Sequence, residues 1–238
     1  MLPGEFEYRR ATSVEEAVSL LAENEEAKLL AGGHSLLPMM KLHFAAPSML
    51  VDIGGIQELV FTKQDEDSLV VGSMTTHAHI ASSDTVGAEY GALAEAAASI
   101  GDVQVRNRGT IGGSLAHADP AADYGAATLA LDAQIELMGP NGQRSVDATN
   151  FFSGFLSTSM EPAELITAIR FPSTGNSVSV YEKFAQPASG FAIVGVAAKI
   201  TKQDNCCVAA RIAATGIADR PVRLPIVEEA LTGGELDN

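Results

Sequence analysis

Two short glycine-containing segments carry the residue types best suited to chemistry in this chain. The first is LLAGGHSLLPMMKL at 29–42, and the second is RGTIGGSLAHADPAADY at 108–124. Glycine lets a backbone approach a ligand closely and adopt positive φ at little steric cost. Successive N–H groups in such turns form an anion-binding concavity. The pattern therefore predicts two backbone cradles for phosphate groups, and neither cradle needs a lysine.

Polar side chains beside each glycine pair extend this prediction. Ser35 follows the first pair, while Thr110 and Ser114 bracket the second. Two cradles suit a long ligand with two phosphates and two ring systems. His34 and His117 could donate hydrogen bonds near such a ligand or could simply pack in the loops. A tight turn between strands is the ordinary interpretation of an isolated glycine pair, so the spacing alone leaves that alternative open.

The usual nucleotide-binding fingerprints are missing. No G-x-G-x-x-G follows an apolar run, and no G-x-x-x-x-G-K-[ST] occurs. The first pattern marks a Rossmann fold and the second marks a P-loop. The sequence supports neither of these folds.

Composition limits the partners that the chain can bind. The net charge is −15, hydrophobic residues make up 46%, aromatic residues 5%, and Trp is absent. An acidic chain gains no affinity for nucleic acid from counterion release, so no nucleic-acid partner is expected. No apolar run approaches the ~20 residues of a membrane span, and MLPGEFEYRR lacks the apolar core of a signal peptide. The expected location is the cytoplasm, with peripheral attachment to the inner membrane face through a complex as an alternative.

Candidate metal ligands are scarce. Cys206 and Cys207 are adjacent, and two cysteines are too few for an iron–sulfur cluster or a structural zinc site. His77 and His79 would share one face of a strand, but they lack acidic or cysteine neighbours, and a polar turn cluster fits them better. The sequence predicts no metal site in this chain. If the protein moves electrons, the metal lies in another chain.

Periodicity indicates the elements that must hold the loops. Ser13-Val14-Glu15-Glu16 fits a capping box and predicts a helix from that point. Short apolar runs predict buried strands over 27–31, 49–53, 69–74, 134–138, 164–171, 178–184, 191–200 and 206–213. Helices are expected over 89–100 and, after Pro221, over 222–231. The small polar segment 173–177 is the best candidate linker, and the pattern as a whole is α+β with a boundary near Gly175.

The segments AGGHSLLPMMKL and RNRGTIGGSLAHADPAADY resemble the FAD-binding medium subunit of the molybdenum hydroxylases, the family that includes medium chains of aerobic carbon monoxide dehydrogenase and FAD subunits of xanthine dehydrogenase. The resemblance runs from PGEFEYRRATSVEEAVSLL to about Leu231. It implies a p-cresol methylhydroxylase-type FAD-binding fold over 1–175, with two α+β subdomains at about 1–54 and 55–175. A carbon monoxide dehydrogenase flavoprotein-type α/β domain is expected over 176–238, shortened relative to the family.

The resemblance also implies FAD as the cofactor of this chain. Both loops would wrap the FAD diphosphate, and further positions would line the flavin. The expected cofactor-binding residues are Ala31, Gly32, Gly33, His34, Ser35, Leu36, Thr110, Ile111, Gly112, Gly113, Ser114, Asp123, Leu165, Ile166, Lys183 and Phe191. Ser114 stands where many relatives carry Asn and keeps a hydroxyl donor. Phe191 stands where some relatives place Tyr, and it cannot donate a hydrogen bond.

The function implied by the family is electron transfer as an oxidoreductase subunit. A large molybdenum-cofactor subunit would oxidise the substrate, and a small subunit would relay electrons through two [2Fe–2S] clusters. This chain would pass them from FAD to quinone, oxygen or NAD, within a dimer of heterotrimers. No catalytic residue is expected here because the cofactor carries the redox chemistry.

Two alternatives to this function stay open, and the substrate is not determined. The chain could be a stand-alone flavin oxidase or reductase of the same superfamily, or a non-catalytic nucleotide-binding module. The substrate of the complex could be carbon monoxide, a purine, an aldehyde or an N-heterocycle, because the oxidising site would lie in another subunit.

Overall fold

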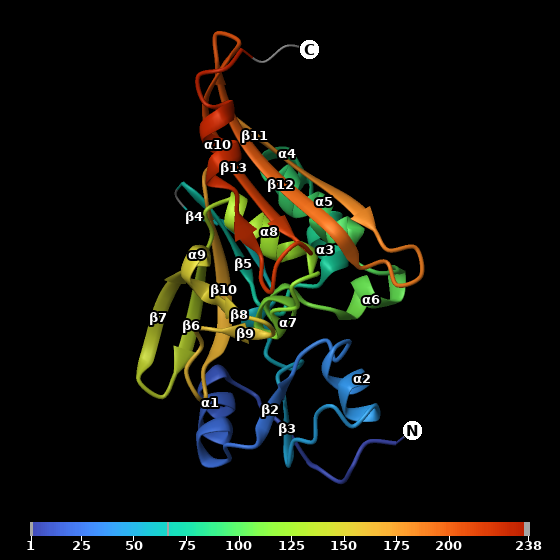
Figure 1. Ribbon diagram of the computed structural model, residues 1–238. Helices are drawn as coiled ribbons and strands as arrows, with labels where there is room; N and C mark the ends of the chain where they lie inside the picture. The colour runs from blue at the N-terminus through green and yellow to red at the C-terminus, as the bar shows by residue number, and fades with distance from the viewer. Residues whose placement is uncertain (1, 66, 236–238) are drawn as a thin grey trace.

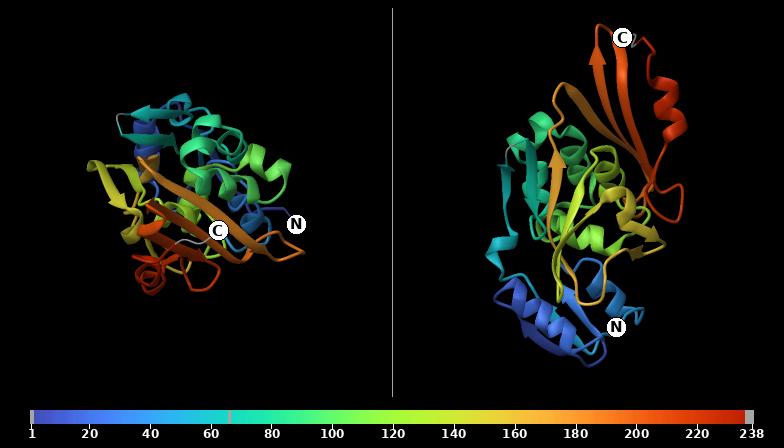
Figure 2. Two further views of the ribbon diagram at one scale, coloured as in Figure 1. Left: turned by 90° about the horizontal axis from the view of Figure 1, so that it is seen from above. Right: turned by 90° about the vertical axis from the view of Figure 1, so that its left-hand side faces the viewer.

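The computed structural model describes residues 2–65 and 67–235 and has the expected α+β architecture. A small amino-terminal unit lies at one end of the molecule (Figure 1). Beyond it, a group of helices lies between a five-stranded sheet and a carboxy-terminal four-stranded sheet (Figures 1 and 2). The helices therefore form the middle layer of the larger part.

The amino-terminal unit is a parallel three-stranded sheet with the strand order β1-β3-β2. It consists of β1 (Glu7–Arg10), β2 (Ala27–Leu30) and β3 (Met49–Asp52). Parallel neighbours need a crossover connection. The helices α1 (Val14–Glu23), between β1 and β2, and α2 (Leu36–Lys41), between β2 and β3, supply these connections. The first glycine loop is the turn between β2 and α2.

The second sheet is antiparallel throughout, with the strand order β4-β5-β10-β6-β7. Its strands are β4 (Thr62–Asp65), β5 (Ser68–Gly72), β6 (Gln134–Gly139), β7 (Gly142–Asp147) and β10 (Leu165–Pro172). The chain leaves β5 for a long helical excursion and returns at β6. The second glycine loop lies within that excursion, beyond the end of β5.

Six helices make up the excursion between β5 and β6. They are α3 (His77–Ala81), α4 (Asp84–Glu89), α5 (Gly91–Ser99), α6 (Val103–Arg108), α7 (Ile111–His117) and α8 (Asp123–Ala130). Every residue of α8 is buried, and its sequence DYGAATLA is dominated by small side chains. Small side chains on all sides let a helix pack closely against both covering layers, and alanine also has the highest helix propensity. The core thus runs through α5 and α8.

The carboxy-terminal sheet is antiparallel with the order β11-β12-β13-β14. It contains β11 (Ser177–Ala185), β12 (Ala192–Gln203), β13 (Cys206–Thr215) and β14 (Val222–Arg223), followed by α10 (Pro225–Leu231). Alternate residues of a strand face opposite sides. Tyr181 on β11, Ala197 on β12 and Ala213 on β13 accordingly join the core. The residues next to Ala197 in β12 face the opposite side of the sheet.

The remaining elements are short. They are a 3₁₀ turn at Gln57–Leu59, α9 (Ala148–Phe151), β8 (Phe152–Gly154) and β9 (Ser157–Thr158). The expected helix over 222–231 begins only at Pro225, because Val222 and Arg223 pair with β13 instead. Within the described ranges, no helix has the length and apolar character needed to cross a bilayer.

Candidate functional site

The first glycine loop leaves a run of main-chain donors without protein partners. Gly33 has φ of +77°, a left-handed conformation that favours glycine. Within residues 2–65 and 67–235, nothing accepts a hydrogen bond from the main-chain N–H of residues 32–36. Ser35 precedes α2, but its hydroxyl makes no capping bond to that helix. These residues are half-buried or exposed, so the donors are accessible to a ligand.

The second glycine loop uses its main-chain donors inside the protein. Thr110 caps α7, and its Oγ1 accepts the Gly113 N–H at 3.2 Å. The N–H of Ile111 donates to Thr75 O at 3.1 Å, and that of Gly112 donates to Ser73 O at 2.9 Å. Of the polar groups in this loop, the Ser114 hydroxyl makes no hydrogen bond to a described residue. The loop is therefore a buried support that still presents one hydroxyl.

The two loops lie against each other. A methyl group placed on Gly32 would overlap the carbonyl oxygen of Arg108, just before the second loop. A methyl group on Gly113 would lie 3.5 Å from Ala31 Cβ, and one on Gly112 would lie 2.5 Å from Ser73 Cβ. Glycine is required at Gly32 and Gly112 by neighbouring protein atoms rather than by a ligand. Close packing of the two loops brings the free donors of the first beside the second.

A buried histidine supports the second loop. The main-chain N–H of His77 donates to Gly109 O at 3.1 Å, and the ring Nδ1 of the same residue lies 3.1 Å from Tyr124 Oη. Burial, and then the nearby charges of His34 and Arg106, lower the pKa of His77 to about 4. Burial raises the pKa of Tyr124 well above its ordinary value. Both groups are neutral near pH 7, so they pack at low desolvation cost.

The structure corrects the sequence-based placement of this histidine. His77 and His79 lie in α3 rather than in a turn or on a strand. Their side chains also differ in burial, because His77 is buried and His79 is exposed. The sequence did not connect His77 to the site, although its partner Tyr124 is the last residue of the second glycine segment.

Asp123 and Lys183 come together as a buried ion pair. Their side chains are each 7% exposed, and Lys183 Nζ lies 2.9 Å from Asp123 Oδ1. Tyr181 Oη donates to the same carboxylate at 2.6 Å, and Lys183 also donates to Ser99 O at 3.1 Å. Burial, reinforced by the Asp123 charge, raises the pKa of Tyr181. This network joins the first residue of α8 to the inner face of β11.

The other three residues expected near the flavin are not gathered with this pair. Leu165 and Ile166 are buried on β10, in two different hydrophobic clusters. Phe191 is 51% exposed, beside the turn between β11 and β12. Its N–H donates to Ser189 Oγ at 3.3 Å. Of the three side chains, Phe191 alone presents substantial surface to a ligand.

Known proteins resemble the chain over its whole length. Residues 4–174 match the family described as FAD binding domain in molybdopterin dehydrogenase, and residues 179–238 match the CO dehydrogenase flavoprotein C-terminal domain. The carbon monoxide dehydrogenase medium chain of Hydrogenophaga pseudoflava is 44% identical over 94% of this chain and 78% of its own length. The glyceraldehyde dehydrogenase medium chain of Sulfolobus acidocaldarius is 37% identical over 100% of this chain and 85% of its own.

The fold agrees with a solved structure of one such protein. Carbon monoxide dehydrogenase from Hydrogenophaga pseudoflava, in a form that lacks the Mo-pyranopterin moiety of its cofactor, superposes with a TM-score of 0.96. The match covers 100% of this chain and 84% of the solved chain, at 43% identity. Similarity at this level extends to both glycine loops and to the carboxy-terminal sheet.

Proposed function

The chain belongs to the family of FAD-binding medium subunits of the molybdenum hydroxylases, and on this premise we propose that it binds FAD at the first glycine loop and carries electrons within such a complex. It has the p-cresol methylhydroxylase-type FAD-binding domain and the flavoprotein-type carboxy-terminal domain that the glycine motifs implied. It is accordingly an oxidoreductase component. The electron-transfer role and the partners belong to the proposal.

One observation carries the proposal: the unpartnered N–H groups of residues 32–36. Five consecutive donors in a glycine turn form a concavity for an anion, and the oxygens of a diphosphate are strong acceptors. The hydroxyls of Ser35 and Ser114 can add donors from both loops. The residues present therefore fit the diphosphate of FAD, although the chain is strongly acidic overall. Fixed backbone dipoles replace lysine in this arrangement.

The chain's own residues position the cofactor rather than react. FAD, when bound, supplies a redox centre that can take up electrons and release them to an acceptor. The second loop packs directly against the first at Gly32, and His77 supports the second loop through its bond to Gly109 O. The Asp123–Lys183 pair fixes the carboxy-terminal sheet against α8. The protein thus contributes binding and orientation.

The partners are proposed from the family. A small subunit with two [2Fe–2S] clusters would deliver electrons, and a large molybdenum subunit would oxidise the substrate. The relatives named above oxidise different substrates, as their names state, while their medium chains stay similar. The substrate is therefore a property of the large subunit. The final acceptor, whether quinone, oxygen or NAD, would meet the FAD of this chain.

The test of FAD binding uses two matched glycine variants. Gly33 and Gly142 both have positive φ, of 77° and 96°, but Gly142 lies in the turn between β6 and β7 with open space around it. Gly33→Ala and Gly142→Ala therefore impose similar backbone strain. We expect FAD affinity, followed by flavin fluorescence, to fall by about tenfold or more only in Gly33→Ala. Equal affinity in the two variants would refute the assignment.

The test of the proposed partners is native mass spectrometry of the complex isolated from its source. We expect one FAD per copy of this chain, together with a molybdenum subunit and an iron–sulfur subunit. Isolation as a lone flavoprotein that oxidises its own substrate would favour the stand-alone flavin oxidase or reductase instead.

A further inference from the structure

A polar cavity lies between the carboxy-terminal sheet and the FAD-binding domain, at the opposite end of β11 from Lys183. Its volume is about 160 Å³, enough for several water molecules. The inner face of the sheet contributes Ser177, Lys199, Thr201 and Arg211, and the facing wall contributes Asp132 and Ser173. No aromatic side chain lines it. The cavity therefore offers charge and hydroxyl groups rather than a surface for a ring.

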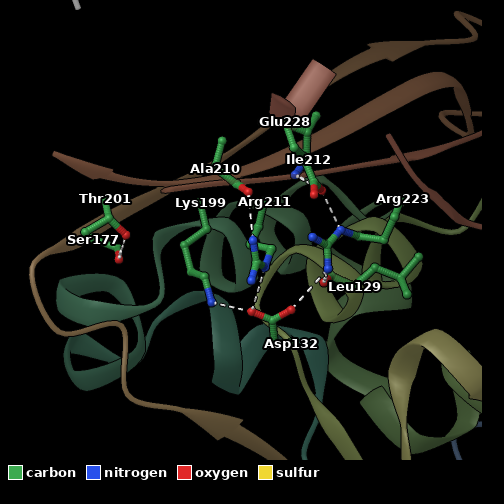
Figure 3. Close-up of polar contacts among 10 residues, drawn as sticks. All are labelled: Leu129, Asp132, Ser177, Lys199, Thr201, Ala210, Arg211, Ile212, Arg223 and Glu228. Atoms are coloured by element: carbon green, nitrogen blue, oxygen red, sulfur yellow. Dashed lines mark hydrogen bonds and ion pairs between the residues drawn. The ribbon is translucent and has the colours of Figure 1, made fainter. Parts of the chain in front are cut away.

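Positive charge is concentrated at this cavity. Lys199 and Arg211 are directly opposite each other on β12 and β13, and like charges at such positions destabilise a sheet. Both share one counterion with Arg223: Asp132 lies 2.8 Å from Lys199 Nζ, 3.4 Å from Arg211 Nε and 3.1 Å from Arg223 Nη1. Figure 3 shows the three cationic side chains converging on that carboxylate.

One further carboxylate serves this group. Glu228 on α10 lies 2.6 Å from Arg223 Nε, so Arg223 contacts both carboxylates, while Lys199 and Arg211 pair with Asp132 alone. Three cations thus face two carboxylates. The cluster keeps an excess positive charge on a chain whose net charge is −15.

Several donors around the cavity have capacity left for a ligand. Lys199 is 14% exposed and has three N–H donors, yet Asp132 is the one described acceptor for it. Arg211 Nη1 donates to Ala210 O at 3.1 Å, and no described residue accepts from its Nη2. Ser177 and Thr201 bond to each other at 2.8 Å, so one hydroxyl hydrogen of that pair is unused. These donors come from three neighbouring strands and surround a space that an anion can fill.

We propose that this cavity binds inorganic phosphate, which then bridges the carboxy-terminal sheet and the FAD-binding domain. A phosphate ion offers acceptor oxygens to Lys199, Arg211 and the hydroxyl groups. At neutral pH it also retains a proton that can be donated to the Asp132 carboxylate. Sulfate has the same shape but no proton, so it repels that carboxylate. The site accordingly prefers phosphate to sulfate.

The proposal is tested by calorimetric titration of inorganic phosphate into the FAD-loaded full chain, in which FAD occupies the first glycine loop. We expect a single site, with sulfate binding more weakly. Arg211→Gln removes charge-assisted hydrogen bonds and should weaken phosphate binding by about tenfold or more. Lys202→Gln is the matched control, because Lys202 is an exposed cation of the neighbouring strand β12 that lies outside the cavity. It should leave phosphate affinity unchanged.

Additional variants keep the result decisive. Ser177→Ala combined with Thr201→Val preserves every charge and should also weaken phosphate binding, which covers the case that Arg211→Gln does not fold. Unchanged phosphate affinity in Gly33→Ala would place the phosphate site outside the first glycine loop. Absence of binding to the wild-type chain, equal affinity for sulfate, or wild-type affinity in both cavity variants would overturn the proposal.

Discussion

The two glycine loops share a sequence pattern and differ in what their backbone does. In the first loop, the N–H groups of residues 32–36 have no described protein acceptor. In the second, the N–H groups of residues 111–114 all donate to protein atoms, two of them beyond β5 at Ser73 and Thr75. A Gly-Gly pair can thus leave its main-chain N–H groups free for a ligand or use them to bind neighbouring protein segments. The pattern of satisfied backbone donors distinguishes the two roles.

The largest expected effect concerns the buried Asp123–Lys183 ion pair, which joins α8 to β11. Asp123→Ala leaves the Lys183 ammonium buried without its carboxylate, which typically costs about 3–5 kcal/mol. Urea denaturation should show this loss in the free energy of unfolding. The double variant Asp123→Leu with Lys183→Met removes both charges and should recover most of it. A single variant with wild-type stability would mean that α8 and β11 do not depend on this pair.

The next effect compares the glycine pairs directly. Gly112→Val pushes a side chain into Ser73, and overpacking of this kind costs about 3 kcal/mol. Gly33→Val mainly imposes strain at positive φ, about 1–3 kcal/mol, with greater loss of FAD than of stability. Thermal unfolding and flavin absorbance, measured on both proteins, check this order. Greater destabilisation by Gly33→Val would invert the assigned roles.

A pH dependence follows from His77. Its folded-state pKa of about 4 lies below the ordinary histidine pKa of 6.5, so the unfolded chain binds the proton more readily. The stability contribution is complete above pH 6.5 and is lost as the pH falls toward 4. Between about pH 7 and about pH 5 the loss should be about 2 kcal/mol. Urea midpoints at the two pH values measure it.

Two variants of α3 isolate that pH effect. His77→Gln should reduce the pH dependence of stability, whereas His79→Gln, on the exposed side of the same helix, should keep it. An identical pH profile in both variants would show that other groups control the acid sensitivity.

The smallest expected effect is a difference in stability between variants of two hydroxyl residues, Thr110 and Ser35. Thr110→Ala removes the cap of α7 and should cost about 1 kcal/mol. Ser35→Ala removes no capping bond and should change stability by less than about 0.5 kcal/mol, while FAD affinity falls. Differential scanning calorimetry with parallel FAD titration tests the contrast. A stability loss in Ser35→Ala equal to that in Thr110→Ala would remove the distinction between the loops.

Local sequence signals predicted many of the elements but not every boundary. Ser13 caps α1 as predicted, with its Oγ accepting the Glu16 N–H at 3.2 Å. Glu16, however, accepts from Thr12 N rather than from Ser13, so the reciprocal half of the capping box is shifted by one residue. Pro225 starts α10 because the preceding residues pair with β13. Pairing between distant strands decided that boundary, and no local pattern reports it.

The candidate site was still harder to predict from local sequence patterns. Both glycine loops stand out in the sequence. However, two main-chain N–H groups of the second loop donate to the carbonyl oxygens of Ser73 and Thr75, which lie far from it in the sequence. The cavity residues Asp132, Lys199 and Arg211 are spread along the chain and have no shared motif. Contacts between distant segments therefore determine which polar groups stay free, and these are the groups available to a ligand.

The most direct test of the account is an experimental structure of the chain with FAD bound. We expect diphosphate oxygens within hydrogen-bond distance of main-chain N–H groups of residues 32–36, while the Gly112 N–H remains bonded to Ser73 O. A diphosphate held away from the first loop, or held by the main chain of residues 111–113, would contradict the central claim.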